Sequence, residues 1–162
     1  SVHESAARRV RDHNFIDVTI IEGVRDPNKT TMIGDCQSPE LLKPERAEGF
    51  NDFAPEPDCR IKETCIFCKM YAVHADEIDI RKLLSFKLLI TELGATMPVE
   101  EWSVKWAPYE ERIEEIFAEM RKVRPEVKDI IIETEDQVSC GMLDDYWADV
   151  LSDMYEFGRL TA

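Results

Sequence analysis

The chain has 162 residues, and 44% of them are hydrophobic, which is enough apolar material for the core of one ordinary domain. Its 20 basic and 34 acidic side chains give a formal net charge of −14. From residue 71 onward the sequence holds 10 basic and 21 acidic residues, so most of the negative charge lies there. A surface this acidic repels phosphate backbones and attracts basic proteins, which argues against direct nucleic-acid binding by this segment.

No apolar run approaches the roughly 18 residues that a membrane-spanning helix needs, so the sequence excludes a membrane protein. The chain begins at Ser1 without a basic-then-apolar leader. We interpret it as a piece of a longer protein that lacks a secretory signal, and we expect it in the cytoplasm.

Residues 1–33 predict an N-terminal arm or the end of a preceding domain. The segment 13–23 alternates apolar and polar residues, a turn-forming stretch follows at 26–29, and 30–33 is again β-prone, so a short β-hairpin is expected. Residues 34–58 contain four prolines and little periodicity. This predicts a long loop, and a loop of that length inside a compact domain needs a tether.

From residue 76 onward the hydrophobic spacing is helical. It predicts a largely buried helix over 76–93, a second helix from Val99 that bends or divides at Pro108, and a third over 127–138. Apolar residues between 143 and 154 mark a fourth helix, which Asp144-Asp145 open and Gly158 closes. The predicted fold is therefore mainly α, with about four helices packed around the helix at 76–93. Residues 34–75 form a Cys-rich metal-binding segment, residues 76–162 an acidic helical domain, and 34–162 one folding unit.

Four of the five cysteines precede the predicted helices, at Cys36, Cys59, Cys65 and Cys68. Two thiolates in a C-x2-C turn and a second pair can complete a tetrahedral zinc shell, which would tether the long loop. His74 is an alternative ligand in place of Cys36, or else a helix-capping residue. An iron–sulfur cluster on the same thiolates and plain unligated cysteines are the other interpretations.

Other polar residues suggest no second site. Asp76, Glu77 and Asp79 suit the first turn of a helix, where the dipole favours negative charge. Cys140 lacks a local partner and is interpreted as a half-buried apolar residue. His3 and His13 have no ligand spacing around them.

Three tryptophans stand in helical contexts. Trp147 is predicted to lie in the core. Trp102 and Trp106 are either core residues or candidates for a protein interface, because exposed tryptophans commonly anchor interfaces.

The cysteines and the residues after them resemble a known family. The block comprises Gly34-Asp35-Cys36 with Pro39, Asp58-Cys59, Cys65-Ile66-Phe67-Cys68, and the run from Tyr71 through His74 to Ser85. It resembles the C-terminal region of large phage-integrase-like, tyrosine-type site-specific recombinases of bacterial mobile elements. The resemblance covers roughly residues 34–158 and implies DNA integration and recombination by the parent protein.

The chemistry of that family requires an arginine pocket, a His-x-x-Arg motif and a tyrosine nucleophile. His3, His13 and His74 are followed three residues later by Ala6, Ile16 and Glu77, so the motif is absent from this chain. We therefore predict no enzyme here. The expected function is a non-catalytic, zinc-stapled accessory or assembly domain that contacts its own catalytic domain, another protomer or a basic protein. A free-standing acidic adaptor or DNA-mimicking regulator, and an iron–sulfur redox or sensor domain, are the alternatives.

Overall fold

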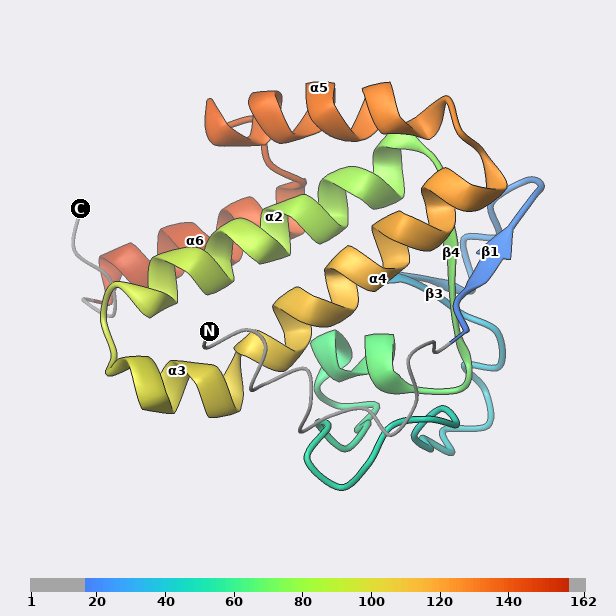
Figure 1. Ribbon diagram of the computed structural model, residues 1–162, viewed down its shortest axis with the longest axis horizontal. Coiled ribbons are helices and arrows are strands. Elements are labelled where there is room, and N and C mark those ends of the chain that lie inside the picture. Colours follow the sequence, from blue (N-terminus) through green and yellow to red (C-terminus); the bar gives the residue numbers. More distant parts are fainter. Residues whose placement is uncertain (1–16, 158–162) are drawn as a thin grey trace.

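The computed structural model describes residues 17–157, in which helices make up about half of the chain beside a small four-stranded sheet (Figure 1). This agrees with the predicted mainly α class. The helices are the 3-10 helix η1 (Lys62–Phe67), α2 (Glu77–Gly94), α3 (Val99–Lys105), α4 (Ala107–Val123), α5 (Val127–Ser139) and α6 (Asp145–Glu156). The predictions made for residues 1–16, including His3 and His13, and for Gly158 lie outside the described residues.

The sheet pairs its strands differently from the predicted hairpin. Its strands are β1 (Thr19–Ile21), β2 (Thr30–Thr31), β3 (Gly34–Cys36) and β4 (Tyr71–His74), in the order β1-β4-β3-β2. β1 runs parallel to β4, while β2 and β3 form the antiparallel hairpin, so the predicted pairing of 13–23 with 30–33 is wrong. Every residue of β4 is buried, and such a strand needs a hydrogen-bonding partner on each edge.

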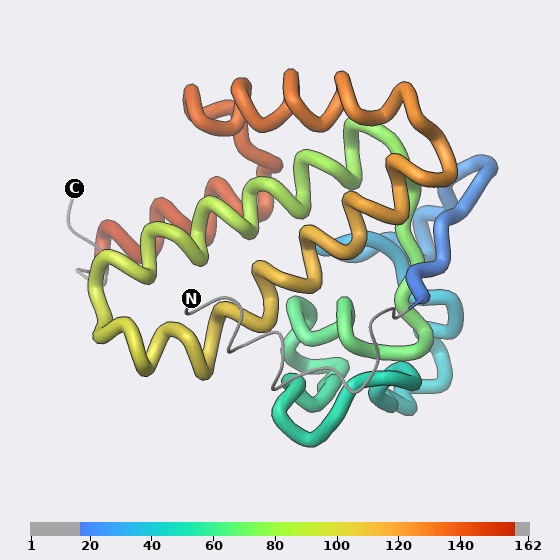
Figure 2. Tube along the Cα trace, in the orientation of Figure 1, coloured from blue at the N-terminus to red at the C-terminus, as the bar shows by residue number. Residues whose placement is uncertain are grey.

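Helix α2 contacts α3, α4, α5, α6 and β3. In Figure 2 the tube shows α2 running between α5 and α4. It begins where the sequence predicts, because the side chain of Asp76 accepts a hydrogen bond of 3.0 Å from the backbone N–H of Asp79 and caps the first turn. The largest fully buried side chains of the core come from η1, α2, α4, β4 and the turn between β2 and β3, and are Phe67, Phe86, Phe117, Ile33, Ile66, Ile80, Leu83, Ile90, Ile113, Ile116, Met120 and Val73.

The second predicted helix divides two residues before Pro108. α3 ends at Lys105 and α4 starts at Ala107, with Trp106 between them. Pro108 lies in the first turn of α4, where the missing N–H costs nothing because that turn has no intrahelical acceptor for it.

The three tryptophans pack against the core. Trp147 is 3% exposed and donates from Nε1 to the carbonyl oxygen of Met32 at 2.8 Å, so its predicted core position is confirmed. Trp102 donates to the carbonyl oxygen of Ile90 at 3.0 Å, and the ring of Trp106 contacts Phe86 and Tyr109. Both are half-buried, and their role at an interface stays a prediction.

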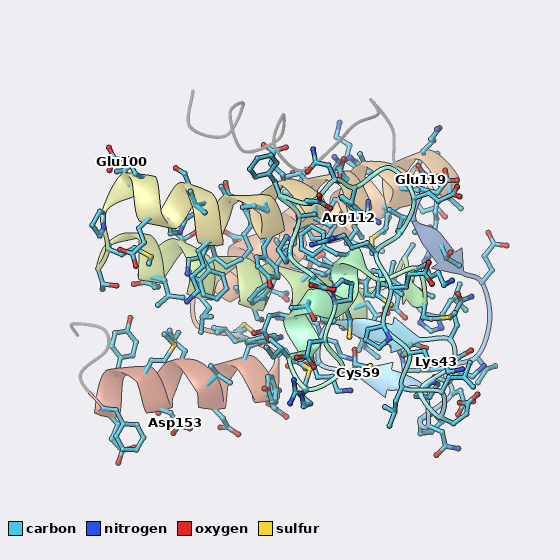
Figure 3. All side chains as sticks on the ribbon, turned by 90° about the horizontal axis from the view of Figure 1, so that it is seen from below. Lys43, Cys59, Glu100, Arg112, Glu119 and Asp153 are labelled. Atoms are coloured by element: carbon cyan, nitrogen blue, oxygen red, sulfur yellow. The ribbon has the colours of Figure 1, made fainter. Side chains whose placement is uncertain are left out.

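Arg112 of α4 attaches the Cys-rich segment to the helices (Figure 3). Its side chain is almost fully buried, and Nε donates to the carbonyl oxygen of Ile66 in η1 at 3.0 Å. Nη2 donates to the carbonyl oxygen of Asp17 just before β1 at 3.1 Å, and the guanidinium lies over the ring of Phe50. Residues before and after the predicted boundary at 75 therefore share one core.

Gly34 provides a test of the sheet. A Cβ at this position would lie 2.8 Å from a ring carbon and 2.8 Å from the hydroxyl oxygen of Tyr71, and the φ of +147° at Gly34 disfavours any L side chain. We expect Gly34→Ala to lower the free energy of unfolding by about 3 kcal/mol, measured by urea denaturation. Gly23→Ala is the matched control, because its φ is +151° and its Cβ would meet nothing within 4 Å. It should cost about 1 kcal/mol. Equal losses in both variants would contradict the close approach of Tyr71.

Candidate metal centre

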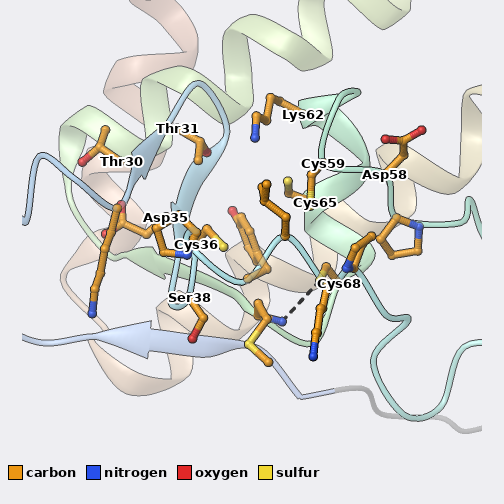
Figure 4. Close-up of a pocket in the computed structure, with 18 of the residues that line it drawn as sticks. Thr30, Thr31, Asp35, Cys36, Ser38, Asp58, Cys59, Lys62, Cys65 and Cys68 are labelled. Atoms are coloured by element: carbon orange, nitrogen blue, oxygen red, sulfur yellow. Dashed lines mark hydrogen bonds between the residues drawn. The ribbon is translucent and has the colours of Figure 1, made fainter.

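The four predicted cysteine ligands line one pocket of about 230 Å³ (Figure 4). Cys36 is the last residue of β3, Cys59 lies in the loop before η1, Cys65 lies within η1, and Cys68 directly follows it. All four are free thiols of intermediate burial. The fold thus brings Cys36 across the proline-rich loop to the other three cysteines.

Local hydrogen bonds fix the segments that carry these thiols. The Thr64 hydroxyl accepts from the backbone N–H of Asp58 at 2.9 Å and donates to the carbonyl of Ile61 at 2.6 Å, which holds the turn around Cys59 against η1. Cys36 pairs with Tyr71 in the sheet, and the backbone N–H of Tyr71 donates to the carbonyl of Cys68 at 3.1 Å. Each thiol is therefore attached to a hydrogen-bonded backbone rather than to a free loop.

Burial and the nearby positive charges act in opposite directions on the thiols. Burial raises the pKa of Cys65 to about 11; the charge of Lys62 lowers it, and the other three cysteines raise it. The backbone N–H of Met70 points at Cys68 Sγ at 3.5 Å, which is a hydrogen bond that stabilises a thiolate. Lys29, Lys43 and Lys62 also line the pocket. Their charges oppose the excess negative charge that four thiolates would create.

The sulfur atoms are farther apart than a zinc site requires. Among the described cysteines, no three sulfurs lie within 4.8 Å of one another. A tetrahedral zinc ion with Zn–S bonds of about 2.3 Å needs its sulfurs about 3.8 Å apart. Metal binding would therefore have to draw the four side chains inward.

His74 lies away from the cysteine pocket. Its side chain is almost completely buried, and Nδ1 is 3.3 Å from Asp79 Oδ2 and 3.9 Å from Asp35 Oδ1. It is not among the residues that line the pocket, whereas Cys36 is. The geometry thus favours Cys36 over His74 as the fourth thiol-site ligand.

A second group of potential ligands was missed from the sequence. One ligand atom each of Asp35, His74 and Asp79 lies within 4.8 Å of the other two, and all three residues are buried. They come from β3, β4 and α2, and only the strand register brings them together. No local sequence pattern indicates this group, because Asp35 lies in the segment predicted as a loop and Asp79 lies in the first turn of a predicted helix.

The prediction that Cys140 is half-buried is wrong. Cys140 is exposed rather than half-buried, because it follows the last residue of α5 at the solvent side of that helix. It therefore supplies a control thiol remote from the pocket.

No protein-family model, no curated protein and no solved structure matches the chain. Within residues 17–157, none of the helices has the length and apolar character that crossing a membrane requires. The likeness to recombinases therefore stays a prediction.

The raised pKa of Cys65 gives a pH test on chelator-treated protein. Between pH 9.0 and about 11 the unfolded chain loses the Cys65 proton while the folded chain keeps it. The folded state then binds more protons, so the free energy of unfolding falls as pH rises through this range. Tyr71 and Tyr109, whose pKa values are also raised by burial, add to the loss above pH 10.

The measurement is urea denaturation from pH 8 to 11, with Cys65→Ser as the matched variant. The variant should lack the part of the decline that starts near pH 9. Superimposable pH profiles would show that the Cys65 thiol is not protected from deprotonation by the fold.

Proposed function

We propose that this chain is a non-catalytic assembly domain whose cysteine pocket holds one structural zinc ion. The observation that carries the proposal is the convergence of four thiols, from both sides of the proline-rich loop, on one pocket. Four protein ligands fill a tetrahedral shell and leave no position for a substrate or water, which is typical of structural rather than catalytic zinc.

A folding role explains why the ligands are spaced as they are. Cys36 ends a strand of only three residues, and Cys59 lies in a loop whose own hydrogen bonds are few and local. A zinc ion joining them to Cys65 and Cys68 would connect the loop to β3 and η1 at once. Binding of such an ion is coupled to folding, since the unfolded chain offers no preformed site.

The acidic helices support a protein partner. Residues 127–156 hold nine acidic side chains and one basic side chain. Along α6, Asp145, Asp149, Asp153 and Glu156 are all exposed. A surface of this charge fits a basic protein better than a phosphate backbone.

The likeness to tyrosine-type recombinases identifies a candidate for that partner. We infer that the chain is an accessory domain of a DNA integrase and that α6 meets the basic catalytic domain of the same chain or of another protomer. The alternative of a free-standing acidic adaptor or DNA-mimicking regulator uses the same surface on an unlinked basic protein. The reading frame separates the two, because an Arg, a His-x-x-Arg and a Tyr encoded upstream of residue 1 support the integrase, and their absence from the frame contradicts it.

Zinc content tests the central part of the proposal. Cys65→Ser should lower zinc, measured by elemental analysis of the purified chain, by one ion per chain, and should reduce helical circular dichroism or thermal stability. Cys140→Ser is the matched control and should keep both, because Cys140 is exposed and remote from the pocket.

Iron distinguishes the remaining alternative. The same four thiolates can hold an iron–sulfur cluster, which would give a brown protein with visible absorbance that is lost in air. A colourless chain in which Cys65→Ser changes neither metal content nor stability would overturn the metal centre itself.

A further inference from the structure

We propose that Asp35, His74 and Asp79 form a second cation site, which binds a divalent ion of the Mn²⁺ or Zn²⁺ type through two carboxylate oxygens and one imidazole nitrogen. The site is distinct from the cysteine pocket and does not depend on the zinc proposed there. It joins the sheet to the first turn of α2, because its residues belong to β3, β4 and that turn.

The spacing of the three atoms suits a metal ion. His74 Nδ1 is 3.3 Å from Asp79 Oδ2 and 3.9 Å from Asp35 Oδ1. Bonds of about 2.1 Å place neighbouring ligands about 3.0 Å apart in an octahedral shell and about 3.4 Å apart in a tetrahedral one. The three ligand atoms all lie within 4.8 Å of one another, so binding would require Asp35 Oδ1 to move toward His74 Nδ1 by about 0.5 Å for a tetrahedral shell.

Two buried polar atoms at the site lack hydrogen-bond partners. Asp35 is 2% exposed and its Oδ1 has no partner, and the same holds for Nε2 of His74, which is 5% exposed. An ion between Asp35 Oδ1 and His74 Nδ1 would satisfy the first of these atoms. Leaving a buried carboxylate oxygen unpaired is costly, so a cation that contacts it stabilises the fold.

Nearby basic side chains do not fill this role. Arg25 Nη1 is 2.7 Å from Asp79 Oδ1, and Arg25 Nη2 is 2.5 Å from Asp76 Oδ2. Lys82 Nζ donates to the carbonyl oxygen of Thr31 at 2.8 Å and is 3.6 Å from Asp79 Oδ1. Both cations are thus engaged on the side of Asp79 that faces away from His74.

The local charge balance also favours another cation. Three carboxylates, those of Asp35, Asp76 and Asp79, face the two basic groups of Arg25 and Lys82. A proton on His74 Nδ1 would serve Asp79 at 3.3 Å but would leave Asp35 Oδ1 at 3.9 Å, whereas a metal ion contacts both.

Asp35 is also among the residues that line the cysteine pocket (Figure 4). Its side chain faces His74, and neighbouring residues of a strand point to opposite faces, so the carboxylate lies on the face of β3 opposite to the Cys36 thiol. The donor set determines which ions stay, because oxygen and imidazole ligands accept Mn²⁺, whereas the thiolates select Zn²⁺.

Mn²⁺ is the probe that separates the two sites. Titrated into the full chain loaded with a single equivalent of zinc, which the thiolates retain, Mn²⁺ should lose the electron paramagnetic resonance signal of the free ion at one equivalent per chain. His74→Gln and Asp35→Asn should each weaken this binding by more than the roughly 10- to 100-fold that loss of an outer-shell partner costs. Asp52→Asn is the control, since the Asp52 side chain is fully exposed and should contribute nothing.

Imidazole ligation has a direct readout in a chain that keeps His74. Bound Mn²⁺ should show spin-echo modulation from a coupled ¹⁴N nucleus, and a variant with His3→Gln and His13→Gln, which leaves His74 as its one histidine, should retain it. This measurement decides the question even if His74→Gln fails to fold.

The outcomes distinguish this proposal from the zinc proposal. Cys65→Ser that loses zinc but still binds one Mn²⁺ supports two separate sites. Mn²⁺ that stays free at millimolar concentration, or that binds equally weakly to the wild type and to His74→Gln, overturns the second site whatever the zinc content. An equal loss in Asp52→Asn would also overturn it, because the ion would then be held by the acidic surface in general.

Discussion

Asp79 is the group through which the sheet and the helices are held in register. Its carboxylate is fully buried in the first turn of α2, where the helix dipole favours negative charge. One oxygen accepts from Arg25, which lies between β1 and β2, and the other accepts the backbone N–H of His74 at the end of β4 at 2.8 Å. Removing the carboxylate would leave the buried N–H of His74 without its acceptor and the partly buried Arg25 with Asp76 as its remaining partner, so three elements depend on one side chain.

This dependence explains why the helices were predictable and the sheet was not. The helical spacing of apolar residues is local, and it placed α2 within one residue at each end and α5 within one residue as well. The strands have two to four residues each. Sequences this short do not indicate which strand pairs with which. The pairing of β1 with β4 follows from the burial of β4 and from contacts such as Arg25 with Asp79, which lie 54 residues apart in the chain.

The two groups of candidate ligands also differ in whether the sequence predicts them. Its cysteines were found from sequence because a C-x2-C turn is a local motif whose chemistry is specific. The group of Asp35, His74 and Asp79 was not predicted as a site. By sequence, Asp79 is typical of the first turn of a helix, and Asp35 lies in a segment predicted to be an irregular loop. The register of β3 on β4 brings these groups together. The sequence alone therefore could not predict that the three side chains lie close to one another.

Charge is distributed unevenly between the thiol pocket and the helices α5 and α6. The acidic residues dominate α5 and α6, while three lysines, Lys29, Lys43 and Lys62, gather at the thiol pocket. Four protonated thiols are neutral, whereas four thiolates with one Zn²⁺ carry a charge of −2. The lysines repel one another around the neutral pocket and are attracted to the charged one, so they favour the metal-bound form. Within this acidic chain, the three lysines beside the thiols therefore supply a local positive charge that favours thiolates over neutral thiols.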